Sequence, residues 1–478
     1  MLMRVLVWFR TDLRVVDNPA LHHACGSADR GVVALFVITA KQWRGHDWGA
    51  NKVDFILRNL DSLSKSLKKL NIPLLVRSAG TFTQVPSTLR RVAKDCQCDT
   101  LCFNAEYEVN ERRRDEAVRR AFEQRGLKVH MLHDQTVIRP DVIRTKEDRF
   151  YTVFTPFKRA WLGHLAELGR PAPLGRPKRQ AELVAAPDIV PERWAGFASG
   201  EAIRKLWPAG EKTAHRRLAA FIEHHIADYK RKRDEAAIKG TSRLSPYLAA
   251  GVISARQCLD AALQANNGRL ETGRAGPLTW ISELIWREFY RHILVGFPRV
   301  SMNRAFRLET ERLAWRDDAE GFEAWCEGRT GFPIIDAAMR QLNETGWMHN
   351  RLRMIVAMFL TKDLFIDWRR GERYFMQHLI DGDLASNNGG WQWAASTGTD
   401  AAPYFRIFNP FSQSRKFDAA GDFIRRYVPE LRDAEGDAVH EPARLPEMLR
   451  SMLDYPEPIV DHAEARQRTI AAFRALKE

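Results

Sequence analysis

The sequence predicts an α/β N-terminal domain, with a parallel, Rossmann-like sheet flanked by helices, followed by an all-α C-terminal domain. Short β-branched runs alternate with helical patterns before residue 134, which is typical of βαβ units. Beyond a proline-rich stretch the apolar spacing is helical to the end of the chain. A chain of 478 residues also exceeds a single domain of about 100–150 residues, so two domains are expected.

The first strand is expected at the start of the chain, and four more follow at regular intervals. The five predicted strands are Val5–Trp8, Val32–Thr39, Leu74–Arg77, Thr100–Asn104 and Val129–Leu132. Between the second and third, apolar residues from Val53 to Leu70 keep helical spacing. Strands that alternate with helices imply right-handed crossovers and a parallel sheet. No Gly-x-Gly-x-x-Gly follows the first strand, so dinucleotide binding there in the Rossmann manner is not expected.

The domain boundary is predicted where periodicity disappears. Five prolines lie between residues 169 and 193, as expected of a connection that crosses the surface. We therefore expect an α/β domain over residues 1–133, an interdomain connection over 134–205 and a helical domain over 206–478.

Composition limits the possible partners and locations. Lys and Arg total 74 against 60 acidic residues, a net charge of +14, which favours a polyanion such as nucleic acid over a merely basic, solvated surface. No apolar run reaches the roughly 18–20 residues that span a bilayer. Six scattered cysteines suit free thiols in a reducing cytosol, which predicts a cytoplasmic protein without a metal site.

The segment 381–410 is the most informative part of the chain. It combines the carboxylates Asp381 and Asp383 with Asn387-Asn388 and a Trp-Gln-Trp, residues that a packed core rarely selects. A bound, flat ligand with polar edges explains them better. This segment, together with Glu283–Tyr290 and Gly346–Met354, closely resembles the flavin-binding core of the DNA photolyase/cryptochrome family. The resemblance covers nearly the whole chain and implies FAD as cofactor.

Several residues are implied as FAD ligands by this resemblance. Read alone, Ser245 is a helix N-cap and Pro246 the first helical residue, a helix start that suits either a diphosphate or ordinary capping. The resemblance favours the diphosphate. The implied FAD-binding residues are Tyr229, Thr241, Ser242, Arg243, Leu244, Ser245, Trp280, Arg287, Asn350, Arg353, Asp381, Gly382, Asp383 and Asn387.

A two-faced helix is predicted beyond residue 349. Asn350, Arg353 and Met354 share one face, while Leu352, Ile355, Val356 and Phe359 form the opposing core stripe. The resemblance pairs Arg353 with Asp381 beside the flavin, where a plain salt bridge is the alternative. It also places Asn387 opposite the flavin N5, where plant cryptochromes typically carry Asp and animal ones Cys, so Asn favours repair.

A second helical face predicts the substrate pocket. Trp280, Glu283, Arg287 and Tyr290 follow at i, i+3, i+7 and i+10, with Trp286 beside them. By resemblance this pocket receives a pyrimidine dimer flipped out of DNA, photolyases being a known example of base extrusion. Trp286 and Trp393 would form apolar walls of the pocket, and Glu283 would bind the edge of the dimer. Asn350 and Met354 would also line the pocket. The implied DNA-backbone contacts are Lys158, Arg233, Arg351 and Arg406.

The lesion, the electron path and the antenna follow from the same resemblance. Asn350 and Met354 stand where (6-4) photolyases carry histidines, which favours a cyclobutane dimer. Trp391, Trp368 and Trp315 match an electron-relaying triad, although core packing would explain any three of 14 tryptophans.

His46, Asn110 and Glu111 match a pocket for 5,10-methenyltetrahydrofolate, with helix initiation as the alternative for Asn110 and Glu111. Ser301-Met302 replaces the Cys-Lys of the closest folate-binding relatives, which predicts weaker folate binding.

We therefore expect a monomeric class I cyclobutane pyrimidine dimer photolyase that acts on UV-damaged DNA, with Glu283, Asn387 and Met354 as catalytic residues. A cryptochrome photoreceptor and a (6-4) photolyase are the alternatives. Only Cys258 and Cys326 fall in the second half of the chain, too few for the four-cysteine iron–sulfur cluster of a distant photolyase branch.

Overall fold

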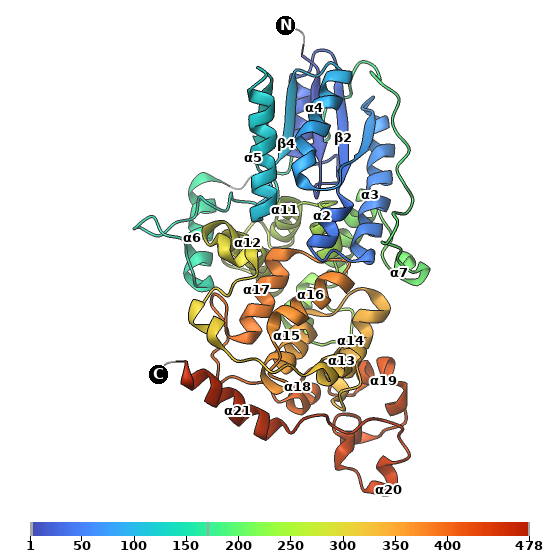
Figure 1. The fold of residues 1–478 in the computed structure, drawn as a ribbon, viewed down its shortest axis with the longest axis vertical. Coiled ribbons are helices and arrows are strands. Elements are labelled where there is room, and N and C mark those ends of the chain that lie inside the picture. The colour runs from blue at the N-terminus through green and yellow to red at the C-terminus, as the bar shows by residue number, and fades with distance from the viewer. Residues whose placement is uncertain (1–2, 170–171, 477–478) are drawn as a thin grey trace. The chain divides into compact units, whose positions relative to one another are not determined.

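The computed structural model describes residues 3–169 and 172–476 (Figure 1). Contacts in space group them into two compact units. The first unit holds residues 1–227, 242–298 and 380–382, and the second holds residues 228–241, 299–379 and 383–478, apart from the few residues outside the described ranges. This grouping rests on spatial contacts and not on periodicity along the chain, so the predicted domain limits stay a prediction.

The first unit contains a five-stranded parallel sheet in the order β3-β2-β1-β4-β5. Its strands are β1 (Val5–Phe9), β2 (Val32–Ile38), β3 (Leu74–Ser78), β4 (Thr100–Asn104) and β5 (Lys128–Leu132). Each observed strand lies within one residue of its predicted limits. The central strands are fully buried, as expected of β-branched runs covered by helices on both sides. The predicted α/β fold of this region is confirmed.

Helices cover the sheet and extend the first unit beyond it. Leu6, Trp8 and Leu35 share an apolar cluster with Leu89 and Val118, which lie on α4 (Val85–Asp95) and α5 (Val109–Glu123). The other α-helices are α1 (Pro19–Ser27), α2 (Ala40–Gly45), α3 (Ala50–Lys68), α6 (Phe154–Leu168), α7 (Glu201–Leu206), α8 (Glu211–His224), α10 (Ser245–Ala249), α11 (Ala255–Ala265) and α12 (Ala275–Gly296).

The proline-rich connection lies along the edge of the sheet. Residues 172–200 contain neither helix nor strand. The Val76 N–H donates to the Asp188 carboxylate at 2.8 Å, and the Asp188 N–H donates to the Leu74 carbonyl at 2.9 Å. These bonds satisfy backbone groups of edge strand β3 that would otherwise offer a template for another chain.

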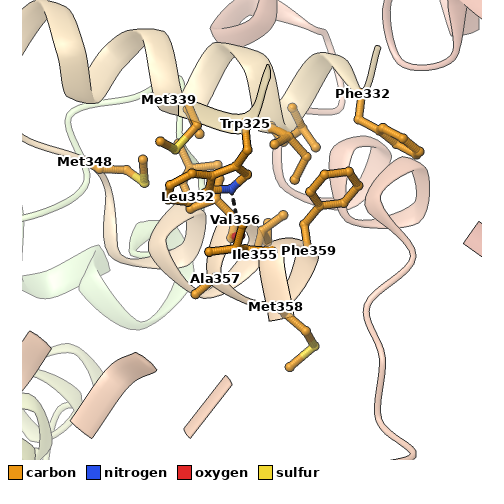
Figure 2. Packing of buried hydrophobic residues seen from close by; sticks show 14 of the residues in the cluster. Trp325, Phe332, Met339, Met348, Leu352, Ile355, Val356, Ala357, Met358 and Phe359 are labelled. Carbon is orange, nitrogen blue, oxygen red and sulfur yellow. Dashed lines mark hydrogen bonds between the residues drawn. The ribbon is translucent and has the colours of Figure 1, made fainter. Parts of the chain in front are cut away.

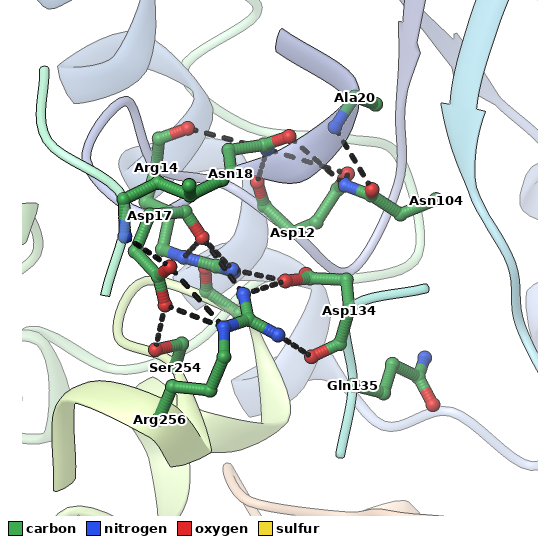
Figure 3. A network of polar contacts seen from close by, with 12 residues as sticks. Asp12, Arg14, Asp17, Asn18, Ala20, Asn104, Asp134, Gln135, Ser254 and Arg256 are labelled. Atoms are coloured by element: carbon green, nitrogen blue, oxygen red, sulfur yellow. Dashed lines mark hydrogen bonds and ion pairs between the residues drawn. The ribbon is translucent and has the colours of Figure 1, made fainter. Parts of the chain in front are cut away.

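A buried polar network joins the loops beyond β1 and β5 to the start of α11 (Figure 3). The Arg256 guanidinium donates to Asp17 at 3.0 Å and to Asp134 at 2.7 Å, and Arg14 donates to Asp134 and to the Gly251 carbonyl. The Ser254 hydroxyl donates to Asp17. Burial raises the pKa of Asp134, but the Arg14 and Arg256 guanidiniums lower it further, so its pKa lies below the ordinary value.

The second unit is helical in its described residues. Its α-helices are α9 (Tyr229–Lys232), α13 (Ala319–Glu327), α14 (Pro333–Thr345), α15 (Asn350–Met358), α16 (Trp368–His378), α17 (Leu384–Ala395), α18 (Pro410–Phe417), α19 (Asp422–Tyr427), α20 (Glu447–Arg450) and α21 (His462–Ala475). A π-helical turn, η5 (Phe359–Asp363), extends α15 directly. The predicted helical character of the C-terminal region is confirmed.

An apolar core between α13, α14 and α15 holds the second unit together (Figure 2). Leu352, Ile355 and Val356 of α15 are buried against Trp325 of α13 and Met339 of α14. The Trp325 indole N–H donates to the Val356 carbonyl at 3.1 Å, so the buried polar atom of this large side chain has a partner. The predicted core stripe of α15 is confirmed.

Two further features concern membrane spans and the surface of α5. Among the described residues, none of the helices has the length and apolar character that a membrane span requires. The sequence carries a basic run at residues 112–114, of which Arg112 and Arg113 are exposed, whereas Arg114 is buried and pairs with Glu106 and Asp115. These two buried carboxylates compensate the charge of Arg114.

Asp134→Ala should destabilise the protein by about 3–5 kcal/mol, because it leaves two buried guanidiniums without their shared carboxylate. Since the folded-state pKa of Asp134 is lowered, its contribution is present above pH 4 and lost as the pH falls through that lowered value. Urea denaturation followed by circular dichroism measures the change. Asp141→Ala, which removes an exposed ion pair with Arg139, is the control. Equal stability of the two variants would contradict a structural role for the network.

Candidate functional site

Helix α12 presents the predicted substrate face. Leu284, Ile285 and Phe289 are buried, whereas Glu283, Trp286, Arg287 and Tyr290 are only partly buried. Trp280, one turn earlier, is buried and packs against Phe221 with ring centroids 4.9 Å apart. The predicted acid, cation and aromatics therefore do line one side of a single helix, while Trp280 is part of the packing at its start.

The surroundings of this face fix its aromatic wall and its cation. Trp286 stacks on Phe154 with centroids 3.6 Å apart and an interplanar angle of 8°. The Arg287 guanidinium donates to the Gln135 carbonyl at 2.5 Å. Lys158 of α6 donates to the hydroxyl of Ser282, the residue before Glu283, at 3.2 Å. The structure thus places the predicted DNA contact Lys158 beside the predicted substrate face.

A buried carboxyl on the opposite side of α12 holds this helix in place. Glu288 accepts hydrogen bonds from the Trp161 indole at 2.6 Å and from the backbone N–H groups of Val137 and Ile138. Burial raises the pKa of Glu288, and these hydrogen bonds oppose the rise. Sequence analysis missed this residue, although an acidic residue on the apolar stripe of a helix is a usable signal for such an anchor.

The predicted phosphate-binding segment is a tight turn before α10. Arg243 has a left-handed φ of 51°, and its guanidinium lies 4.9 Å from the Trp207 ring. The helix begins at Ser245 itself, with Leu244 as the cap residue and no side-chain cap bond. The assignment of Ser245 as N-cap was therefore wrong by one residue, because Leu244 already has helical backbone angles. A helix start preceded by hydroxyl groups and an arginine fits an anionic group.

Tyr229 and Thr241, the other predicted phosphate ligands, belong to the second unit. Tyr229 is buried at the start of α9, and the Arg233 guanidinium lies 5.5 Å from its ring. Asp234 is 3.8 Å from Arg233 and accepts two hydrogen bonds from Arg351, at 2.9 and 3.3 Å. The predicted DNA contacts Arg233 and Arg351 therefore share one carboxylate partner.

Helix α15 carries its predicted polar face. Asn350 is exposed, Arg353 and Met354 are partly buried, and the Arg353 Nε donates to the Met348 carbonyl at 2.9 Å. This bond orients the guanidinium at the base of its own helix. The pairing of Arg353 with Asp381 stays a prediction, since Asp381 and Gly382 belong to the first unit and Arg353 to the second.

The start of α17 fixes Asn387 through hydrogen bonds within the second unit. Asp383 is the N-cap and accepts from the Ser386 N–H and hydroxyl. The Asn387 amide donates to the Glu372 carbonyl at 2.9 Å, and the Asn388 amide donates to the Glu372 carboxylate at 2.9 Å. Because the Asn387 nitrogen is engaged with α16, its amide oxygen is the atom available to accept a hydrogen bond from a ring nitrogen. Glu372 and Asn388 were not predicted.

The three tryptophans of the predicted triad lie in the second unit and differ in burial. Trp391 of α17 packs onto Gly371 of α16 so closely that a Cβ at Gly371 would lie 2.2 Å from the indole. Trp368 is buried three residues before Gly371 on the same helix. Trp315 is partly buried, with its ring 4.9 Å from Phe365. Two interior indoles and one nearer the surface suit a relay of electrons from the surface to the interior.

Trp393 and Arg406 complete the predicted DNA-facing set. Trp393, two residues beyond Trp391, is partly buried and packs against the core of the second unit. Arg406 is exposed in a turn closed by its N–H donating to the Pro403 carbonyl at 2.8 Å. Exposure suits a contact with a phosphate backbone, which needs no preformed pocket.

The structure brings all three predicted antenna residues together. His46 Nδ1 lies 3.3 Å from Glu111 Oε1, and His46 Nε2 lies 3.0 Å from the Asn110 amide and 2.9 Å from the Gln42 amide. Two amide donors on Nε2 require it to accept, so Nδ1 carries the proton and donates to Glu111. The Phe82 ring meets His46 edge-on at 5.5 Å. Gln42 and Phe82 were not predicted, and helix initiation alone does not explain this cluster.

Comparison with known proteins supports the resemblance. The family model described as DNA photolyase matches residues 5–178, and that described as FAD binding domain of DNA photolyase matches residues 280–475. The deoxyribodipyrimidine photo-lyase of Escherichia coli is 46% identical over 473 residues, covering 99% of both chains.

Solved structures agree with these matches. A bacterial class III photolyase from Agrobacterium tumefaciens superposes with a TM-score of 0.87 at 36% identity, covering 100% of this chain and 98% of that one. A Synechocystis cryptochrome superposes with a TM-score of 0.84 at 26% identity, covering 99% of each. Fold and matches together define an FAD-binding flavoprotein with an α/β and a helical part. The chain belongs to the DNA photolyase family, as predicted.

Glu288→Ala should destabilise the protein by about 3 kcal/mol or more, because three buried donors lose their acceptor at about 1–3 kcal/mol each. Glu288→Gln should lose less stability, since its amide oxygen can still accept hydrogen bonds from these donors. Urea denaturation measures both. Glu271→Ala, at an exposed position in the same unit, is the control. A Glu288→Ala variant as stable as the control would show that this carboxyl does not anchor α12.

Proposed function

We propose that this protein is a class I photolyase that repairs cyclobutane pyrimidine dimers in UV-damaged DNA by light-driven electron transfer. The observation that carries the proposal is the face of α12, where Glu283 lies beside Trp286 and Lys158 of α6 donates to Ser282, the residue before Glu283. The relatives at 45% identity or more over the full length are named deoxyribodipyrimidine photo-lyases, which agrees with this chemistry.

The chain's own residues would bind and orient both reactants. Trp286, held flat against Phe154, offers a rigid apolar wall for a flipped dimer, and Trp393 would form another. Glu283 would hydrogen-bond the carbonyl or imide edge of the dimer and hold it in place. Asn350 and Met354 would line the pocket without supplying the histidine pair that (6-4) chemistry uses. When bound, reduced FAD supplies the electron that light transfers to the dimer.

FAD would be held by the predicted residues according to their chemistry. The turn 241–245 and Tyr229 suit the diphosphate, because a helix start and hydroxyl groups bind anions. Asn387 would accept from the flavin ring through its amide oxygen, since its amide nitrogen donates to the Glu372 carbonyl. Trp391, Trp368 and Trp315 would pass electrons inward from the surface to restore reduced FAD. The DNA backbone would meet Lys158, Arg233, Arg351 and Arg406, giving salt-dependent and sequence-independent affinity.

Three further expectations belong to this proposal. 5,10-Methenyltetrahydrofolate would bind at the cluster of His46, Asn110 and Glu111, where an imidazole and a carboxylate are already oriented. The protein would act as a monomer, because one chain carries every predicted residue. Its scattered free cysteines suit the cytoplasm.

Light should cause the loss of cyclobutane dimers from UV-damaged DNA that is incubated with the reduced protein, while a dark sample keeps them. Glu283→Gln should lower the repair yield severalfold, because the amide replaces one carboxyl oxygen that would meet the dimer edge with an N–H donor. Dimer loss measured by chromatography after hydrolysis checks both, and Glu309→Gln at an exposed position is the control. A persistent dimer despite bound, reduced FAD would refute the proposal and favour a (6-4) lesion or light signalling.

His46→Ala should weaken methenyltetrahydrofolate binding at least tenfold, because Glu111 and Asn110 lose the group that orients them. A fluorescence titration of the folate measures the affinity, and dimer repair under light absorbed directly by FAD should stay unchanged. His22→Ala, at an exposed position, is the control. Equal folate affinity of His46→Ala and the unaltered protein would place the antenna elsewhere.

A further inference from the structure

The last helix of the described chain is tied to the π-helical turn η5. The Thr469 hydroxyl of α21 donates to the Lys362 carbonyl at 2.6 Å, and the Arg468 guanidinium donates to the Asp363 carbonyl at 2.5 Å. A π-helical turn leaves carbonyls without their usual helical partners, and such turns occur frequently at functional sites. Here α21 satisfies two of those carbonyls from outside the helix.

Lys362 on this turn is a fully buried cation. Its Nζ donates to the Ser396 hydroxyl at 2.9 Å and to the Ala395 carbonyl at 3.2 Å, and lies 4.0 Å from the Phe473 ring of α21. Burial lowers the pKa of Lys362 to about 7. None of these partners is an anion, so the docked helix encloses a lysine that is close to losing its charge.

Asp363, the next residue, is equally buried. Its Oδ1 lies 2.5 Å from His462 Nδ1, at the first residue of α21. Its Oδ2 is buried without a hydrogen-bond partner among the described residues. Burial raises the pKa of Asp363 to about 6, while the His462 bond and the Arg468 charge act in the opposite direction. We call Lys362, Asp363 and His462 the clasp.

Other charged groups around the clasp are engaged elsewhere or act on Arg468. Burial lowers the pKa of Arg468, as does the nearby Arg316, while Asp363, Glu464 and Asp318 raise it. Helices α15 and α16 also pack on η5, and three of their arginines pair with carboxylates outside the clasp. Arg351 pairs with Asp234, Arg369 with Glu311 and Arg370 with Asp317.

Helix α21 and the outermost tryptophan of the predicted triad pack on the same small apolar cluster. Phe473 of α21 is buried in this cluster with Leu313 and Phe365. Trp315 packs against the cluster, as do Ala472 and Leu476, and the Trp315 ring lies 4.9 Å from Phe365. The segment that the clasp holds therefore completes the apolar surface on which Trp315 rests.

We propose that α21 is a cover over Trp315, that the clasp of Lys362, Asp363 and His462 holds it closed, and that its opening controls the access of small thiol reductants to the triad. The inference rests on the proposed electron relay. Under light, Trp391 would give an electron to bound FAD, Trp368 would refill Trp391, and Trp315 would refill Trp368. Two external thiols that each return one electron to Trp315 would leave one disulfide and two protons, and FAD reduced by these two electrons would take up at least one of the protons.

Because Lys362 and Asp363 are buried when α21 is docked, the docking of α21 should depend on pH. Undocking hydrates Lys362 and returns its pKa toward 10.5, so the open form takes up a proton above pH 7 and rising pH favours docking. Undocking returns Asp363 toward 3.8, so the docked form alone keeps a proton between pH 4 and 6, and falling pH favours docking there. Docking should therefore be weakest between about pH 6 and 7.

Hydrogen exchange of the α21 amides tests the clasp on the holoprotein. After correction for intrinsic rates, exchange should slow severalfold from pH 7 to 9. Because one proton is linked to undocking, the exchange rate can change by at most about tenfold per pH unit. Lys362→Met should abolish this slope. His462→Ala should speed exchange at least tenfold at pH 7, and Arg466→Ala, on the exposed side of α21, should not. A slope retained in Lys362→Met, or unchanged exchange in His462→Ala, would overturn the clasp.

The rate at which light and dithiothreitol reduce the bound FAD tests the cover. His462→Ala should raise this rate at least twofold over the parent and Arg466→Ala, and the increase should vanish in the Trp315→Phe background. Faster exchange with an unchanged reduction rate would overturn the cover, as would a parent that light and thiol do not reduce. Dimer repair by chemically reduced protein needs no thiol access, so it reports separately on the proposed function and should be equal in all of these variants except those altered at Trp315.

Discussion

The first unit depends on two buried carboxylates, Asp17 and Asp134, which meet two guanidiniums from distant parts of the chain. Arg14 follows β1, whereas Arg256 lies in the first turn of α11. Neither arginine could be buried alone, because an unpaired charge in the interior costs several kcal/mol. Together they fix the start of α11 relative to the end of the sheet. Helix α12 follows α11 in the chain and carries the predicted substrate face.

The same requirement, that every buried charge finds a partner, positions the residues of α12. Glu288 ties its buried side to the backbone at 137–138 and to Trp161. Glu283 and Trp286 remain on the other side, within reach of Lys158 through Ser282. A carboxyl that holds the helix and a carboxyl that would meet the substrate thus lie five residues apart, and only their surroundings separate the two roles.

In the second unit, close packing positions the residues of the proposed flavin site, whereas paired buried charges position the predicted substrate face in the first unit. Gly371 lets the Trp391 indole approach the backbone of α16, and this approach brings Asn387 and Asn388 of α17 to Glu372 of α16. The hydrogen bonds that orient the proposed flavin-facing amide therefore follow from the contact between a glycine and an indole. Elsewhere in this unit, α21 satisfies the Lys362 and Asp363 carbonyls of η5, and this contact joins the last described helix to the proposed cover over Trp315.

By itself the sequence determined the fold class, the five strands, the two faces of α15 and the residues shared with the family, because periodicity and local motifs are properties of neighbouring positions. Through the family resemblance, the sequence also predicted that His46, Asn110 and Glu111 belong to one pocket. Only the tertiary structure decided which partners the buried charges have. Glu288 and Asp363 look like ordinary helix residues in the sequence, since their hydrogen-bond partners lie far along the chain. Pairing of this kind depends on three-dimensional packing, which no local pattern records.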